Sequence, residues 1–160
     1  MASITDLEVR RAGPEDVALL ATLNEHVHAP HVNAEPDVYR TSDEAELREV
    51  YASRLVDPDV VIFIASAEQP LGFALTVHMR APRNAFSPAR ERLLLDTIAV
   101  DPAARRRGVG RALMHATERH ARELGLRSVQ LDVRAFNSEA IRFYEALGYL
   151  PVQHRYERKL

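Results

Sequence analysis

Six stretches of the chain carry the alternating or continuously apolar pattern that predicts β-strands. They cover residues 7–11, 60–67, 71–79, 93–100, 128–133 and 149–156. Glu68-Gln69-Pro70 lies between the second and third stretches, and this short break is typical of a hairpin turn. Irregular structure is predicted around residues 82–88, where Pro, Asn and Ser accumulate.

Helical spacing or helix-start signals mark four further stretches. Helices are predicted from residue 14 onward, over 43–55, from 109 to 124 and over 138–147. Ser42 is the candidate cap of the second helix, and Gly125 and Gly148 stand where the last two should stop. Residues 26–41 contain two prolines and are predicted as a loop. The order of elements predicts a mixed α/β fold with one strand-helix-strand crossover late in the chain.

Composition narrows the class of protein. The 160 residues are 46% hydrophobic and include no Cys, which excludes thiol catalysis, cysteinyl zinc sites and disulfides. A chain of this size buries roughly 70% of the surface that its unfolded form exposes. No repeat or linker divides the sequence, so one domain over residues 1–160 is expected. No stretch has the length of a signal-peptide core or a membrane span, so we expect a cytoplasmic protein without a membrane partner.

Charge is distributed unevenly, although the formal net charge is only -2. Residues 1–100 carry 9 Arg and 16 Asp or Glu, a net charge of −7. Residues 101–160 carry 11 Arg, one Lys and 7 acids, a net charge of +5. This division suggests that the two parts face ligands of opposite sign.

The most informative segment covers residues 93–113, where a strand leads through a basic, glycine-containing turn into a helix. Glycine lets backbone N–H groups approach a ligand, and a helix N-terminus favours negative charge, so this arrangement suits a pyrophosphate. A Walker A loop would need Lys and then Ser or Thr after Gly110, which is followed by Arg111-Ala112. A dinucleotide-binding loop would need a small residue at Leu113. The other interpretation of Arg105-Arg106-Arg107 is a solvated basic turn.

The pattern Arg105-x-x-Gly108-x-Gly110 resembles the acyl-CoA-binding motif of the GCN5-related N-acetyltransferase (GNAT) family. Ile98-Ala99-Val100-Asp101-Pro102 precedes it in family order, and Asn137-x-x-Ala140-x-x-x-Tyr144-x-x-x-Gly148-Tyr149 is similar to the family's second motif. The resemblance is strong over residues 93–149 and weaker over 8–25, where Val9-Arg10-Arg11-Ala12-x-Pro14-Glu15-Asp16 resembles the family's first strand and helix start. It implies an α/β fold with a GNAT-type mixed, mostly antiparallel twisted sheet flanked by helices, and a strand-turn-helix CoA-binding crossover.

The resemblance also implies acetyl-CoA as co-substrate and no metal. Main-chain groups of Ile98, Ala99 and Val100 are expected to pair with the pantetheine arm, and a backbone N–H near Ile98 or Ala99 to hold the oxyanion. Asn137 has two interpretations, a helix N-cap or a contact to the pantetheine or the acceptor. The pyrophosphate is expected at the turn and first helical residues: Arg105, Arg106, Arg107, Gly108, Val109, Gly110, Arg111 and Ala112.

Tyr144 and Asp96 are the candidate catalytic residues that the resemblance implies. Acyl transfer expels a thiolate, which a phenol at Tyr144 can protonate as a general acid. The alternative is a core aromatic, because Ala140, Ile141 and Leu147 share its helical face. The acceptor amine must lose a proton before it attacks, and Asp96 stands where several family members carry a Glu that acts through water. The alternative for Asp96 is a structural carboxylate held by backbone donors or Arg.

Three histidines at positions 26, 28 and 31 have spacing that can ligate zinc, but neither Cys nor an HExxH pattern accompanies them. The alternative is a surface or acceptor-side segment. In GNAT proteins the segment after the first helix borders the acceptor, which makes His28, His31, Asp37 and Tyr39 candidates.

The expected function is transfer of an acetyl group from acetyl-CoA to a primary amine of a small molecule, by direct attack in a ternary complex. A cationic acceptor is one hypothesis from the acidic N-terminal part. The alternatives are acetylation of a protein or peptide N-terminus or lysine, and a non-catalytic acyl-CoA-binding module. Nucleic acid is not an expected partner, because aromatic residues make up only 6% of a slightly acidic chain. A second copy of the chain is a further candidate partner.

Overall fold

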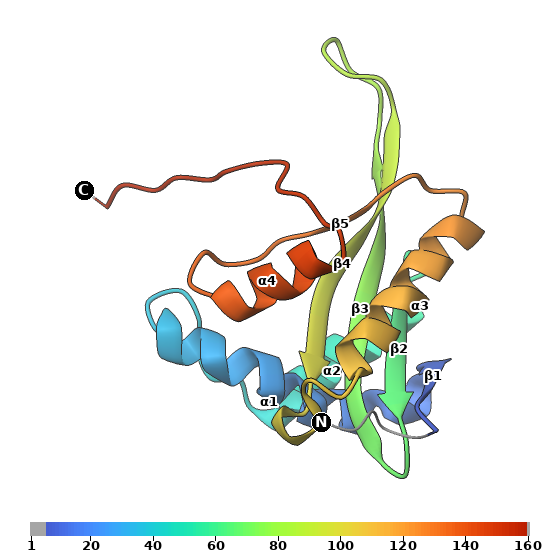
Figure 1. The fold of residues 1–160 in the computed structure, drawn as a ribbon, viewed down its shortest axis with the longest axis vertical. Coiled ribbons are helices and arrows are strands. Elements are labelled where there is room, and N and C mark those ends of the chain that lie inside the picture. The colour runs from blue at the N-terminus through green and yellow to red at the C-terminus, as the bar shows by residue number, and fades with distance from the viewer. Residues whose placement is uncertain (1–5, 160) are drawn as a thin grey trace.

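Five strands form one open, twisted sheet in the order β1-β2-β3-β4-β5 in a computed structural model that describes residues 6–159 (Figure 1). The strands are β1 Glu8–Arg11, β2 Val60–Ser66, β3 Pro70–Ala81, β4 Arg90–Val100 and β5 Val129–Leu131. The pairs from β1 to β4 are antiparallel, and only β5 runs parallel to its neighbour β4. This confirms the predicted mixed, mostly antiparallel sheet with a late crossover.

Two layers of helix cover the sheet. The helices are α1 Val17–Ala34, α2 Glu44–Val56, α3 Val109–Glu123 and α4 Ser138–Ala146, with short 3-10 turns η1 Pro14–Asp16 and η2 Pro102–Ala104. One apolar cluster joins α1 and α2 to β2 and β3 through Leu20, Tyr51 and Phe73, and a second joins α3 and α4 to the sheet through Leu113 and Tyr144. Because side chains alternate along each strand, the sheet supplies both clusters.

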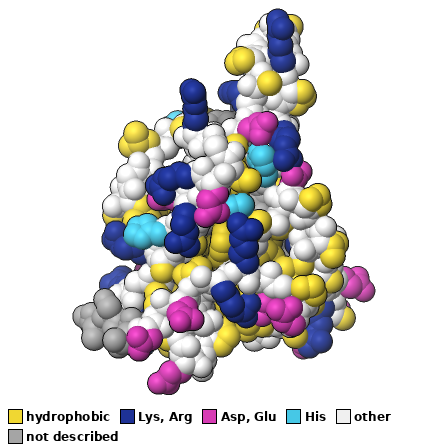
Figure 2. Space-filling model, turned by 90° about the vertical axis from the view of Figure 1, so that its right-hand side faces the viewer, with side chains coloured by type: hydrophobic (Ala, Val, Ile, Leu, Met, Phe, Trp, Pro, Cys, Tyr) yellow, Lys and Arg dark blue, Asp and Glu magenta, His cyan; other side chains and the backbone are white. Residues whose placement is uncertain are grey.

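The β3–β4 hairpin extends well beyond the helices (Figure 1). Its turn is the predicted irregular segment, in which the Asn84 side chain accepts hydrogen bonds from the backbone N–H groups of Phe86 and Ser87 at 2.8 and 3.0 Å. The face shown in Figure 2 carries basic, acidic and histidine side chains close together. Positive and negative side chains therefore alternate on that face, whereas a surface that binds a polyanion is uniformly positive.

The start of α2 differs from the prediction by one residue. Asp43, not Ser42, is the N-cap, because its carboxylate accepts a hydrogen bond from the Glu46 N–H at 2.7 Å while Glu46 reaches back to the Asp43 N–H. An ionised cap with a reciprocal Glu satisfies two N–H groups that the helix itself cannot.

The prediction of a loop over residues 26–41 is wrong for its first half, because α1 continues through Pro30 to Ala34. Proline in a helix removes one hydrogen bond. Contacts from a distant segment hold the end of this helix in place: Arg134 donates two hydrogen bonds to Glu35, and the rings of His31 and Phe136 lie 5.6 Å apart. These contacts join segments about 100 residues apart, so the local sequence does not predict them. They outweigh the preference of Pro30 for a non-helical conformation.

The predicted last strand, 149–156, is also wrong. Residues 150–159 form no strand or helix and are exposed, and we call them the C-terminal tail. A strand needs a partner for its backbone groups, and the described part of the chain supplies none for this segment. Among the described helices, none combines the length and apolar character that a bilayer crossing requires.

Candidate active site

The regular pairing of β4 with β3 is interrupted at Asp96, within the segment 93–113 that the sequence analysis found most informative. Leu95 pairs with Thr76 of β3 and Thr97 pairs with Leu75, so Asp96 between them has no partner on β3 and forms a bulge. β5 accompanies β4 only along Leu93–Leu95. From Asp96 to Val100 the outer edge of β4 has no neighbouring strand within residues 6–159. This free edge offers backbone donors and acceptors to another extended chain.

The turn after β4 brings free backbone N–H groups together at the start of α3. Gly108 is the N-cap of α3 in the left-handed region, with a φ of 95°, and Arg106 is also left-handed, with a φ of 59°. Gly108 has no side chain to cap the helix, and the first helical hydrogen bond is donated by Ala112 to the Gly108 carbonyl, so the N–H groups of residues 109–111 have no helical acceptor. A Cβ added at Gly108 would stand in open space. The turn is therefore suited to an anion.

Gly110 serves a packing role that the sequence did not reveal. A Cβ at this position would lie only 3.2 Å from the ring of Phe143, so the absence of a side chain lets α4 approach the first turn of α3. This contact positions the next residue, Tyr144, in the same apolar cluster as Leu113, against which Ile98 and Val100 of β4 also pack. Tyr144 thus lies on the α3 side of β4.

Tyr144 is buried, and its hydroxyl has no hydrogen-bond partner within residues 6–159. The residue is 9% exposed, and burial raises the pKa of the phenol to about 12. The hydroxyl makes no hydrogen bond to any residue in the described part of the chain, in contrast to Tyr149, which donates to Glu118 at 3.2 Å. The ring packs in the core, as the core-aromatic interpretation expects, and the hydroxyl keeps its hydrogen-bonding capacity, so the general-acid role stays a prediction.

Asp96 is exposed, and its only side-chain hydrogen bond within residues 6–159 comes from the Thr97 hydroxyl at 3.0 Å. Neither backbone donors nor Arg hold it, so the structural-carboxylate interpretation has no support in these contacts. Burial, and next the nearby Asp96 carboxylate, raise the pKa of Tyr51, a residue of the α1–α2 cluster. No contact joins Asp96 to Tyr144, and the two flank β4 from different sides.

Asn137 is the N-cap of α4, and its side-chain oxygen accepts a hydrogen bond from the Ala140 N–H at 3.1 Å. This confirms the capping interpretation of the sequence. Arg105 and Arg106 are exposed and Arg107 is half-buried, and Arg106 lies 3.6 Å from Glu139 of α4. The basic turn is thus tied to the same helix that carries Tyr144.

Three of the four acceptor-side candidates lie together. The Tyr39 ring is 5.2 Å from His31 and 6.3 Å from His28, and the Arg134 guanidinium lies 5.9 Å from its centroid. Asp37 instead is exposed and pairs with Lys159 at 3.6 Å. His28 and His31 contact backbone carbonyls, and residues 6–159 contain no group of three or more His, Asp or Glu arranged for a metal.

Sequence reasoning did not find Arg134 and Phe136, which join the end of α1 to the segment before α4. Both lie in the β5–α4 connection and contact residues about 100 positions earlier in the chain. No local pattern marks them, because their contacts depend only on the folded arrangement.

The chain belongs to the acetyltransferase (GNAT) family, whose sequence model matches residues 23–149. It is 36% identical over 83 residues to [Ribosomal protein bS18]-alanine N-acetyltransferase of Escherichia coli K12, a stretch covering 51% of this chain and 56% of that protein. It is 34% identical over 113 residues to a mycothiol acetyltransferase of a Nocardioides species, covering 67% of this chain and 38% of that protein. The chain thus spans about half the length of the E. coli relative that it matches, and less of the second.

Solved structures show the same fold. A tetramutant of the BH1408 protein from Bacillus halodurans superposes with a TM-score of 0.91 at 22% identity, covering 96% of this chain and 99% of that one. The aminoglycoside N-acetyltransferase AAC(6')-Iy in complex with CoA superposes with a TM-score of 0.76 at 21% identity, covering 96% and 94%.

Proposed function

We propose that residues 1–160 form one acetyltransferase domain, which transfers an acetyl group from acetyl-CoA to a primary amine. The observation that carries the proposal is the junction of β4 and α3. There the edge of β4 that has no neighbouring strand within residues 6–159 is followed, after a short turn, by the start of α3, whose first N–H groups have no acceptor within the helix. An extended arm that ends in a pyrophosphate needs both features in this order, and acetyl-CoA is such a molecule.

Ile98, Ala99 and Val100 would bind the pantetheine arm through their main-chain groups, in the way that an added strand binds a sheet edge. The pyrophosphate would lie against Arg105, Arg106, Arg107 and Gly108 and against the first turn of α3, Val109 to Ala112. The open space at Gly108 supports this placement, because a side chain there would occupy the approach to the helix start. Asn137, which already caps α4, would add a contact to the pantetheine or the acceptor through its amide.

Tyr144 would act on the sulfur. When the amine nitrogen bonds to the thioester carbon, the C–S bond breaks and the sulfur leaves with the electron pair. A phenol whose pKa is about 12 keeps its proton at neutral pH and can donate it, or a hydrogen bond, to that sulfur. The oxyanion that forms transiently would be held by a backbone N–H near Ile98 or Ala99.

Asp96 would act on the amine, directly or through a water molecule, by accepting the proton that nitrogen must lose. Its exposure and its position at the bulge support this role, because the bulge turns a carboxylate out of the regular strand pattern. The attack is direct, so the reaction needs no covalent enzyme intermediate.

The acceptor would approach from the side of Tyr39, His31 and Phe136. On this side Arg134 pairs with Glu35 and Lys159 pairs with Asp37, so these two acids are already compensated. Asp96 makes no ion pair to a described basic residue, so its carboxylate would be available to a cationic amine. A small-molecule amine is the first acceptor class, and a protein N-terminus is the second, because the E. coli relative is named for acetylating an alanine of a ribosomal protein.

Acetyl-CoA binding tests this proposal. At 100 times its Kd, acetyl-CoA should stabilise the protein by about 2.7 kcal/mol. Arg105→Glu should weaken that binding about tenfold or more, because it reverses a charge at the turn, whereas Arg119→Glu makes the same change at another exposed arginine of the following helix and should have little effect. No stabilisation by acetyl-CoA, or equal effects of the two variants, would contradict the proposed site.

A further inference from the structure

An ion pair joins the two helical layers of the molecule beside the outer edge of β4. Glu35 follows α1, which packs on one face of the sheet, and Arg134 lies in the connection from β5 to α4, which packs on the other face. The guanidinium of Arg134 donates two hydrogen bonds to the Glu35 carboxylate, from Nε at 2.7 Å and from Nη2 at 2.5 Å. Figure 1 shows the end of α1 and this connection side by side. A pair with two charge-assisted hydrogen bonds fixes the orientation of both side chains as well as their distance.

Glu35 in turn fixes the path of the chain at the end of α1. Pro30 has no backbone N–H, so the last turns of this helix lack one of their hydrogen bonds. The Glu35 N–H donates to the His31 carbonyl at 2.9 Å, and the Glu35 carbonyl accepts hydrogen bonds from the N–H groups of Val38 and Tyr39, each at 3.0 Å. A residue that holds the backbone on both of its sides transmits its own position to them. The Glu35–Arg134 pair therefore sets the position of Tyr39.

Aromatic rings pack around the same pair and form a wall, which we call the aromatic wall, made of His31, Tyr39 and Phe136. The ring of Tyr39 lies 5.2 Å from that of His31, and the Arg134 guanidinium lies over the Tyr39 ring, 5.9 Å from its centroid. Phe136, from the same connection as Arg134, lies 5.6 Å from His31. A cation over an aromatic ring is attracted to it, so Arg134 holds Tyr39 directly as well as through Glu35.

The aromatic wall lies on the side of β4 that carries Asp96. β5 accompanies the outer edge of β4 only along Leu93–Leu95, and Asp96 is the next residue of β4. Because the two strands are parallel, the chain that follows Leu131, the last residue of β5, continues toward the same end of β4 and soon reaches Arg134. α1 itself contacts β4. An amine that approaches Asp96 along this edge would therefore pass the aromatic wall.

We propose that Arg134 is a positioning residue for the acceptor: by pairing with Glu35, it holds the aromatic wall at the distance from β4 that the amine requires. This inference rests on the proposed function, because an acceptor exists only if the chain transfers acetyl groups. Arg134 acts through Glu35 and Tyr39 and not on the reacting atoms. Its loss should therefore raise the KM for the amine more than it lowers kcat, and acetyl-CoA should still stabilise the protein.

A double-mutant cycle tests the pair. The amine is the fastest substrate among neutral and cationic small amines and a peptide with a free N-terminal alanine. Glu35→Gln and Arg134→Gln should each raise its KM roughly fivefold, the factor that a well-oriented exposed ion pair is worth. The double variant should raise the KM by the same factor and not by the product of the two, because either change alone already breaks the pair.

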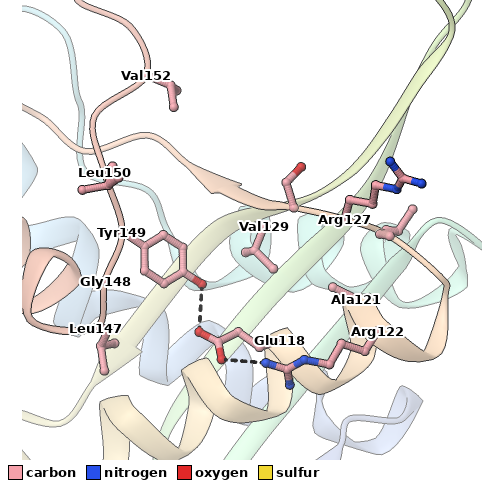
Figure 3. Close-up of a pocket in the computed structure, with 12 residues that line it drawn as sticks. Glu118, Ala121, Arg122, Arg127, Val129, Leu147, Gly148, Tyr149, Leu150 and Val152 are labelled. Atoms are coloured by element: carbon pink, nitrogen blue, oxygen red, sulfur yellow. Dashed lines mark hydrogen bonds and ion pairs between the residues drawn. The ribbon is translucent and has the colours of Figure 1, made fainter.

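Arg122→Gln is the matched control, because it breaks an ion pair between Arg122 and Glu118 within α3 (Figure 3). The side chains of Glu118 and Glu35 are equally accessible, at 26% and 27% exposed. This variant should leave the KM for the amine unchanged. An unchanged KM in Arg134→Gln, independent effects of the two changes in the cycle, or an equal effect of Arg122→Gln would overturn the positioning role.

Hydrogen exchange tests the same contact without acetyl transfer. In Arg134→Gln the backbone N–H groups of Glu35, Val38 and Tyr39 should exchange roughly fivefold faster, whereas those of α3 should exchange as in the wild type. Unchanged exchange at these three residues would overturn the inference whatever the activity. Faster exchange with an unchanged KM would make Arg134 a structural residue only and would also overturn it. If the wild type binds acetyl-CoA but acetylates no amine, the proposed function fails and the acceptor role fails with it, whatever the exchange shows.

Discussion

Tyr144→Phe separates the two interpretations of this residue, because it removes the hydroxyl and keeps the ring. The ring is buried in the cluster with Leu113, and the hydroxyl has no hydrogen-bond partner within residues 6–159. Loss of the oxygen alone should therefore change the free energy of unfolding by less than about 0.5 kcal/mol. The effect on catalysis should be larger, because a hydrogen bond to a developing thiolate is worth about 1.5–3 kcal/mol. That energy corresponds to a roughly 10- to 150-fold decrease in kcat.

Tyr149→Phe is the matched control in the neighbouring motif. Its hydroxyl donates to Glu118 at 3.2 Å, so its loss should cost about 1 kcal/mol of stability, or a few degrees in Tm, with little change in kcat. The two variants should thus show opposite effects on stability and turnover.

The assays are steady-state release of CoA thiol at saturating acetyl-CoA and thermal unfolding of the same samples. Because burial raises the pKa of Tyr144 to about 12, the phenol stays protonated at neutral pH, and its removal should lower kcat without changing the shape of the neutral pH profile. An unchanged kcat in Tyr144→Phe would refute the general-acid role and leave Tyr144 as a core aromatic.

Three further substitutions test other parts of the molecule. Asp96→Asn should lower kcat/KM about 100-fold and remove the acidic limb of the pH–rate profile, and an unmoved limb would show that Asp96 is not the base. Asp16→Asn should cost about 2 kcal/mol in urea unfolding at neutral pH, because Asp16 accepts two hydrogen bonds of 2.7 Å from Arg10. That hydrogen-bonded pair lowers the pKa of Asp16 from 3.8, so the wild-type advantage is present above this value and should disappear as pH falls through the lower folded-state pKa; a constant difference down to acid pH would contradict the assignment. Burial, and next a neighbouring arginine, lower the pKa of His120 below 6.5, so the unfolded chain takes up a proton first and wild-type stability should fall as pH drops below that value. His120→Gln should remove this loss, whereas His115→Gln, at an exposed position of the same helix, should retain it.

Five of the six predicted strands and the glycine-containing turn before α3 could be predicted because local rules determine them. The predicted break at Glu68-Gln69-Pro70 falls at the β2–β3 hairpin, although Pro70 already begins β3, and the glycines at 108 and 125 bracket α3. The family resemblance then orders these elements along the chain, and the match over residues 23–149 confirms it. Segments whose conformation depends on neighbouring residues in sequence are therefore predicted well.

The remaining differences come from contacts between distant segments. α1 passes through Pro30 because Arg134 and Phe136 hold its end, and nothing near Pro30 in the sequence signals them. The bulge at Asp96 depends on the register between β3 and β4, which the apolar pattern does not specify to one residue. The C-terminal tail has strand composition but no strand structure, because pairing requires a partner that the described part of the chain does not supply.

Amine-dependent thiol release is the measurement that tests the central claim most directly. Purified protein with acetyl-CoA should release CoA thiol when a suitable primary amine is added, and mass spectrometry should find the amine heavier by one acetyl group. The panel should contain neutral, cationic and anionic small amines and a peptide with a free N-terminal alanine. Thiol release and acetylated product that require both enzyme and amine are the predicted result. Acetyl-CoA binding without release for any amine would contradict catalysis and favour a binding module, and absence of both would contradict the proposed function.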